Sequence, residues 1–167
     1  EVELSDGMII AKGNLKGSII NFKQSSVGAT GNAIMAAVNL EGTTNIMNAA
    51  QEPEIEALCT FLIQMGAEIR GLGTSKLTIC GNKKLNAGIE YTIIPDRIEA
   101  GTFLMAAAIT AGNITITNTE PSHMEIVLKY LEKAGCKLNI RENTIQIKMQ
   151  NNSINPVDVR TEIYPGF

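Results

Sequence analysis

The sequence lacks tryptophan, has a single histidine and is poor in aromatic residues, which make up 4% of its 167 residues. The core must therefore be built from aliphatic side chains. No apolar run reaches the roughly 20 residues of a membrane-spanning helix, and the first residues lack the pattern of a secretory signal, so we expect no membrane partner. A net charge of −3 argues against nucleic acid as a partner, because nucleic-acid-binding domains usually carry a basic face.

Cysteine is scarce as well. Cys59, Cys80 and Cys136 cannot all pair with one another, and none stands in a CxxC spacing. They fall in apolar or alternating segments, so we interpret them as buried reduced thiols rather than nucleophiles or metal ligands. Reduced thiols fit a cytoplasmic protein. His123, near a predicted helix start, is expected to be a surface residue without a ligand role.

The dominant pattern in the sequence is an internal duplication with a period of roughly 70 residues. The segment 35–48 recurs at 105–118 and the segment 61–69 recurs at 130–138. Each copy reads as helix, strand, helix, strand, strand, with a further strand leading in. One copy is too small to bury a large core, so we expect the copies to stack around shared helices.

In the first copy, a strand at 18–22 leads through a polar turn into the segment 33–40, which is apolar on nearly every side. We predict that this segment forms a helix buried all round and ended by Gly42. The remaining elements of this copy are a strand, a helix that begins at Pro53 and a strand pair, predicted at 43–48, 53–65, and 67–70 with 77–80.

The polar turn Ser26-Val27-Gly28-Ala29-Thr30 feeds this first helix. Free backbone N–H groups and the positive end of the helix dipole favour an anion there, and Gly28 lets a ligand approach the backbone. Ser26 or Thr30 is the expected N-cap. The alternative is a helix start that needs a cap and binds nothing, and the local sequence alone favours this alternative, because one glycine and two hydroxyls are a weak motif.

Four linked motifs, at 26–30, 41–44, 48–55 and 95–103, together resemble UDP-N-acetylglucosamine enolpyruvyl transferases, the 1-carboxyvinyltransferases that open peptidoglycan synthesis. The resemblance runs from about residue 13 to residue 167. It implies an α/β (α+β) fold, an inside-out α/β barrel built of repeated βαβαββ units with helices inside and sheets outside, of which about two units are present.

The resemblance also implies a domain organisation. Residues 1–17 would be the tail of a preceding repeat, and residues 18–94 the repeat that closes one domain. Residues 95–150 would be the first repeat of the other domain, and residues 151–167 the start of a further strand or repeat. The absence of an initiator Met and the apolar end at Phe167 suggest a piece of a longer polypeptide, whose remainder would complete the cleft.

The activity that the resemblance implies is transfer of the carboxyvinyl group from phosphoenolpyruvate to the 3-hydroxyl of UDP-N-acetylglucosamine, without a metal or an organic cofactor. In the family, the segment matching Gln24, Ser25, Ser26 and Val27 contacts the uridine diphosphate, and we expect the same here, together with Gly28. Some family members have a lysine where this chain has Gln24, so one positive charge beside the diphosphate is absent.

Asp96, Arg97 and Glu99 cluster in a segment that the resemblance places at the interdomain cleft, which makes Asp96 and Arg97 candidate catalytic residues. The local alternative is a capping box of Asp96 with Glu99, with Arg97 paired to Glu52 or Glu54 across the repeats. Glu52 and Glu54 either complement the dipole of their own helix or, as the resemblance suggests, orient other groups beside the cleft.

Several motifs of the family have no counterpart in this sequence: the proton-donating cysteine on a mobile loop, the basic residues that hold phosphoenolpyruvate, and a lysine–asparagine pair. The family's aspartate base follows shortly after the segment that matches 164–167. We therefore expect this chain to be catalytically silent on its own. The alternatives are a two-repeat binding or scaffold module, and a sister enolpyruvyl transferase that acts on shikimate 3-phosphate.

Overall fold

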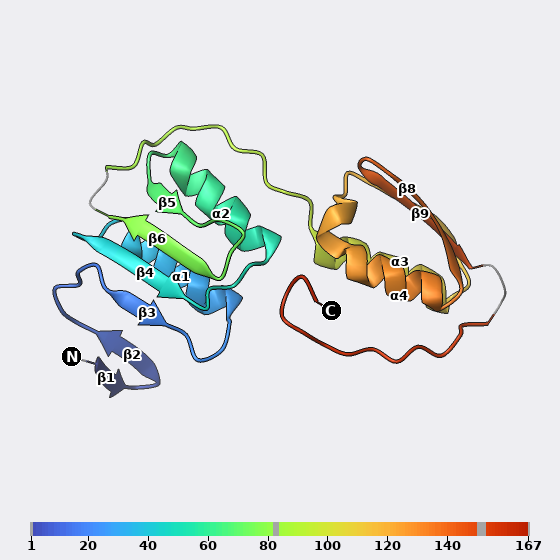
Figure 1. The fold of residues 1–167 in the computed structure, drawn as a ribbon, viewed down its shortest axis with the longest axis horizontal. Helices are drawn as coiled ribbons and strands as arrows, with labels where there is room; N and C mark the ends of the chain where they lie inside the picture. Colours follow the sequence, from blue (N-terminus) through green and yellow to red (C-terminus); the bar gives the residue numbers. More distant parts are fainter. Residues whose placement is uncertain (1, 82–83, 150–152, 167) are drawn as a thin grey trace. The chain divides into compact units, whose positions relative to one another are not determined.

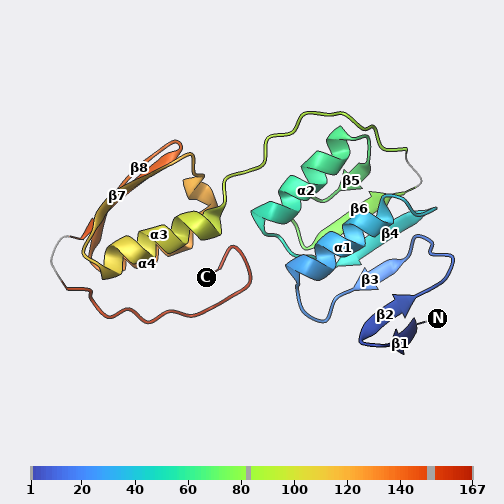
Figure 2. The ribbon, with the colours of Figure 1, turned by 180° about the vertical axis from the view of Figure 1, so that it is seen from behind.

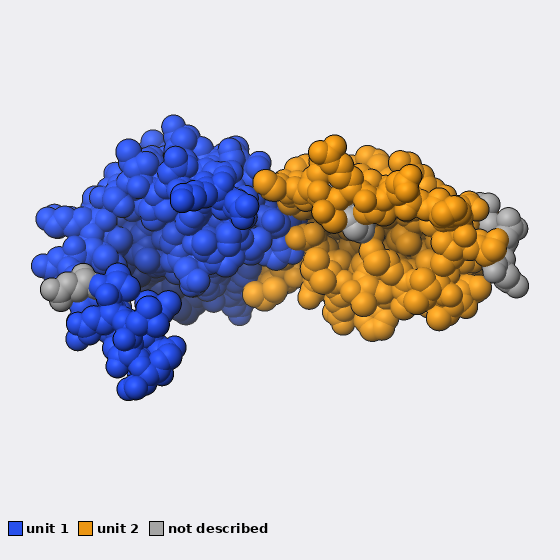
Figure 3. Space-filling view, turned by 90° about the horizontal axis from the view of Figure 1, so that it is seen from below, with its two compact units in different colours: residues 1–91 blue, residues 92–167 orange. Residues whose placement is uncertain are grey.

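The computed structural model describes residues 2–81, 84–149 and 153–166, and it forms two compact units, Glu1–Tyr91 and Thr92–Phe167 (Figure 1; Figure 3). Each unit is built on one copy of the sequence repeat. The expectations that concern the chain's first residue, the boundary at 150–151 and Phe167 lie outside the described residues. The division into domains that the resemblance implies stays a prediction.

Unit 1 is a four-stranded sheet with two helices on one of its faces (Figure 1; Figure 2). The strand order is β3-β4-β6-β5, with β3 parallel to β4 and the other pairs antiparallel. A separate hairpin of two strands precedes it. The elements are β1 (Val2–Ser5), β2 (Met8–Ala11), β3 (Ile19–Asn21), α1 (Val27–Ala37), β4 (Thr43–Met47), α2 (Pro53–Gln64), β5 (Glu68–Arg70) and β6 (Lys76–Cys80).

Unit 2 repeats this plan. Its antiparallel sheet has the order β7-β9-β8, which matches β4-β6-β5, and α3 and β7 each begin one repeat period after α1 and β4. The duplication expected from the sequence is thus present in the element order and in the sheet. No counterpart of β3 leads in, because the described residues 84–96 form no strand. The elements are α3 (Arg97–Ile109), β7 (Asn113–Thr117), η1 (Pro121–Met124), α4 (Glu125–Lys133), β8 (Cys136–Arg141) and β9 (Thr144–Met149).

Each unit has its own aliphatic core between helices and sheet, as the scarcity of aromatic residues predicts. Strand alternation places every second side chain in this layer, as in β9, where Ile145, Ile147 and Met149 are buried. The fully buried large side chains include Ile34, Ile46, Cys59, Leu77 and Ile79 in unit 1, and Leu104, Ile145 and Ile147 in unit 2.

The prediction of a first helix buried on every side is wrong for each unit taken by itself. One sheet covers only one side of a helix, so Met35 on α1 is 47% exposed and Ile109 on α3 is 74% exposed. The predicted end of the helix is also wrong. Helix α1 ends at Ala37, the chain turns through Leu40, and Gly42 lies just before β4 with a φ of +96°.

Candidate functional site

The segment that joins β3 to α1 is fixed at its start by the end of β4. The Phe22 N–H donates to the Met47 carbonyl at 3.2 Å, and the Asn48 side-chain amide donates to the Phe22 carbonyl at 3.0 Å. Asn48 adopts a φ of +58°, a left-handed conformation that asparagine tolerates better than most residues. The start of α1 is therefore held at a set place beside the sheet.

Ser26 is the N-cap of α1. Its backbone is extended (φ −145°, ψ 121°), its Oγ accepts the Ala29 N–H at 3.3 Å, and its carbonyl accepts the Thr30 N–H at 2.9 Å. Of the two expected caps, Ser26 is confirmed and Thr30 is wrong. The helix begins at Val27, before the apolar run, so Gly28 lies in its first turn rather than in a preceding loop.

Two backbone donors at this helix start are open. Within the described part of the chain, neither the Val27 nor the Gly28 N–H meets an acceptor, and α1 has no acidic residue in its first turn. A Cβ at Gly28 would meet nothing within 4 Å. Gln24 and Ser26 to Gly28 are exposed, and Ser25 is half-buried with a hydroxyl oxygen that has no partner among the described residues. This arrangement suits an anion.

The equivalent helix start in unit 2 is closed to an anion. Asp96 stands one repeat period after Ser26, and its Oδ1 accepts both the Ile98 N–H at 2.8 Å and the Glu99 N–H at 3.0 Å. The capping role of Asp96 is confirmed. The capping box is only half formed, because no described contact returns the Glu99 carboxylate to the Asp96 backbone. A direct catalytic role of Asp96 or Arg97 stays a prediction.

Glu52 and Glu54 stand at the start of α2. Glu52 makes no capping bond with its side chain, and its Oε2 is buried without a hydrogen-bond partner in the described residues. Glu54 lies exposed in the first turn, where a carboxylate complements the helix dipole. An orienting role for either residue stays a prediction. So does the pairing of Arg97 with one of them, since it would join residues of the two units.

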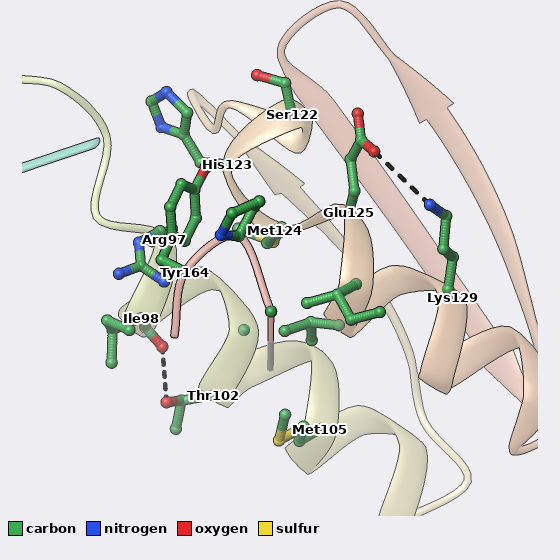
Figure 4. A pocket seen from close by; sticks show the side chains of 15 residues that line it. Arg97, Ile98, Thr102, Met105, Ser122, His123, Met124, Glu125, Lys129 and Tyr164 are labelled. Carbon is green, nitrogen blue, oxygen red and sulfur yellow. Dashed lines mark hydrogen bonds and ion pairs between the residues drawn. The ribbon is translucent and has the colours of Figure 1, made fainter. Parts of the chain in front are cut away.

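A pocket of about 600 Å³ lies in unit 2 between α3, the start of α4 and the segment 164–166 (Figure 4). Arg97 and Tyr164 both line this pocket, and the Arg97 guanidinium lies 5.1 Å from the centre of the Tyr164 ring. His123 is half-buried there, and its Nδ1 has no partner among the described residues; that it has no ligand role stays a prediction. The sequence gives no signal for this pocket, because Arg97 and Tyr164 are far apart along the chain.

The three cysteines form no disulfide. Burial, and secondarily the charge of Glu56, raises the pKa of the Cys59 thiol to about 11, and burial raises the pKa of Cys136. Both thiols are therefore protonated at neutral pH, which fits their interpretation as buried reduced thiols. The expectation of burial is confirmed for these two and wrong for Cys80, which is half-buried at the end of β6.

The described ranges contain neither a cluster of metal ligands nor a membrane-spanning helix. In residues 2–81, 84–149 and 153–166, no three side chains of histidine, cysteine, aspartate or glutamate gather as a metal site. None of the helices described has the length and apolar character to cross a membrane.

A family model described as EPSP synthase (3-phosphoshikimate 1-carboxyvinyltransferase) matches residues 2–167. The chain belongs to this family. Two relatives are named UDP-N-acetylglucosamine 1-carboxyvinyltransferase. The protein of Chlorobium chlorochromatii is 52% identical over 159 residues, and that of Pelodictyon phaeoclathratiforme is 55% identical over 158 residues. Each match covers 95% of this chain but 37% of the relative, so the chain spans well under half the length of these relatives.

Among solved structures, the enolpyruvyl transferase NikO from Streptomyces tendae matches with a TM-score of 0.81 and 20% identity, over 99% of this chain and 42% of that chain. This likeness shows the fold. The enolpyruvyl-transferase-like α/β fold that the four motifs imply is therefore confirmed, and so is the resemblance to UDP-N-acetylglucosamine enolpyruvyl transferases.

Proposed function

We propose that this chain is part of a UDP-N-acetylglucosamine 1-carboxyvinyltransferase and that it holds the diphosphate of the nucleotide sugar. The whole enzyme would move the carboxyvinyl group from phosphoenolpyruvate to the sugar 3-hydroxyl, the first committed step of peptidoglycan synthesis. One observation carries the proposal: the duplicated unit has two equivalent helix starts, and only that of α1 is open to an anion.

The proposed contacts follow from the donors at this helix start. The Val27 and Gly28 N–H groups would donate to diphosphate oxygens, and the Ser26 hydroxyl can donate while its oxygen keeps the Ala29 N–H. The unpaired Ser25 hydroxyl supplies a further polar group. Gln24 adds an amide without a charge, so attraction to the diphosphate would rest on backbone donors and the helix dipole.

The transfer itself requires more than this site. Addition of the sugar hydroxyl to phosphoenolpyruvate needs a general acid, a base, and cations for the carboxylate and phosphate, and elimination then releases phosphate and restores the double bond. The buried thiols Cys59 and Cys136 lie in the cores of the two units, away from solvent. We therefore propose that further residues of a longer polypeptide supply the acid and the cations, and that this chain alone shows no turnover.

Titration calorimetry with UDP-N-acetylglucosamine tests the binding role. We expect Ser26→Ala to weaken binding and Gly28→Val to abolish it, because a branched side chain would fill the space beside the open N–H groups. Gly13→Val is the matched control, since a Cβ at Gly13 also meets nothing within 4 Å. Binding to Gly28→Val as tight as to the wild type would contradict the proposal.

A sister activity on shikimate 3-phosphate is the second candidate, because the matching family model is described by that reaction. Displacement of UDP-N-acetylglucosamine by shikimate 3-phosphate at low concentration would favour this candidate. If the chain is instead a non-catalytic scaffold module, it would bind neither ligand. A longer polypeptide of the relatives' length that contains it would also show no transferase turnover.

A further inference from the structure

A second pocket, of about 460 Å³, lies in unit 2 between the start of α3 and strand β7 with the loop that follows. Its two charged wall residues are Asp96 and Glu99, and no described lysine or arginine lines it. Polar groups of β7 and its loop complete the wall. This pocket is separate from the one that contains Arg97 and Tyr164, which lies on another side of α3.

Thr119 provides a buried hydroxyl on this wall. The residue is 2% exposed, and its Oγ1 has no hydrogen-bond partner in the described part of the chain. Unit 1 has Ala49 at the equivalent position. Its buried threonines are Thr30, whose hydroxyl accepts the Ala50 N–H, and Thr44, whose Oγ1 has no partner among the described residues. Thr119 thus places an unpaired buried hydroxyl at the pocket wall, which is costly unless a ligand or water pairs with it.

Both carboxylates retain unused acceptors. The two capping bonds of Asp96 go to Oδ1, so Oδ2 accepts neither of them. Glu99 makes no return bond in the half-formed capping box, and no described ion pair engages it. A ligand here meets oxygen acceptors, two negative charges and no positive side chain.

We propose that this pocket binds a guanidinium or primary ammonium group. Such a group carries a positive charge and several N–H donors, which match the carboxylates of Asp96 and Glu99 and the hydroxyl of Thr119. The group comes from a basic side chain of a further protein segment or from a small free cation. The proposal concerns unit 2 alone and does not rest on the proposed role of the α1 start.

The test is a ¹⁵N-amide NMR titration of the chain with guanidinium chloride at millimolar concentration, against urea as the neutral isostere at matched ionic strength. We expect saturable shifts at Glu99 and Thr119 with guanidinium and none with urea. Equal shifts with both probes, or none with either, would overturn the proposal. Tighter binding of Nα-acetyl-arginine amide than of putrescine points to a basic side chain as the source, and the reverse order to a free cation.

Charge-removing variants locate the site. Because charge-assisted hydrogen bonds at accessible carboxylates are of modest strength, Glu99→Gln and Asp96→Asn should each weaken guanidinium binding by about three- to tenfold. Asparagine caps a helix as well as aspartate, so the second variant keeps α3 intact. Glu132→Gln, on α4 away from the pocket wall, is the control and should leave binding unchanged. Unchanged affinity in Glu99→Gln and Asp96→Asn would contradict the assignment.

Discussion

The Thr30 hydroxyl accepts a hydrogen bond from the Ala50 N–H at 3.0 Å, and both residues are at most 1% exposed. This bond ties the first turn of α1 to the loop after β4. Together with the bond from Asn48 to Phe22, it holds the proposed anion site from two sides. The rigidity of that helix start therefore depends on polar contacts with the sheet, beyond the packing of the apolar face.

Removing the Thr30 hydroxyl should destabilise unit 1. In Thr30→Val the Ala50 N–H stays buried without a partner, so we expect the free energy of unfolding to fall by about 1–3 kcal/mol. Thr30→Ser keeps the acceptor and should lose less. Urea denaturation followed by circular dichroism measures both. Equal stability of Thr30→Val and the wild type would show that the bond contributes nothing.

Asn48 contributes in two ways: its side chain donates a hydrogen bond to the Phe22 carbonyl, and its backbone adopts a left-handed conformation. Asn48→Gly keeps the left-handed backbone but loses the bond to Phe22, so it should lower the free energy of unfolding by about 0.5–1.5 kcal/mol. Asn48→Ala adds the left-handed penalty of a Cβ and should cost about 1–2 kcal/mol more. Chemical denaturation compares the two variants. Alanine as stable as glycine at this position would contradict the account.

Much of the fold follows from the sequence, because the repeat period fixes where α3 and β7 begin once α1 and β4 are recognised. The burial of the helices does not follow. A helix that is apolar all round carries no periodic signal of which side meets the sheet. The apolar run 33–40 does not mark where α1 begins, because the Ser26 cap, one of the two expected caps, sets the helix start several residues earlier. The Arg97–Tyr164 contact depends on chain geometry that no local pattern encodes.

The exposed side of α3 offers a test of one-sided burial. Ile109 is 74% exposed, so Ile109→Lys should change the free energy of unfolding by no more than about 0.5 kcal/mol. Leu104 is fully buried on the opposite side, so Leu104→Ala should lower the free energy of unfolding by about 2–5 kcal/mol. Thermal or urea unfolding of the two variants gives the comparison. A large loss in Ile109→Lys would mean that this side of α3 is covered.

The thiol of Cys59 predicts a pH dependence. Its pKa is raised to about 11 from an ordinary value of 9.0, so the folded state holds the proton more tightly than the unfolded state. The stability from this group is complete below about pH 9 and is lost as the pH rises toward about 11. Cys59→Ala should flatten that loss.

At pH 8, an alkylating reagent should label the half-buried Cys80 well before Cys59 or Cys136.

The most direct test of the account follows the Val27 and Gly28 amide resonances while UDP-N-acetylglucosamine is added to the chain. The account predicts saturable downfield shifts at these two amides, with a smaller response at Ile98 and Glu99, whose N–H groups Asp96 already occupies. Saturable binding that leaves the Val27 and Gly28 amides unchanged would contradict it.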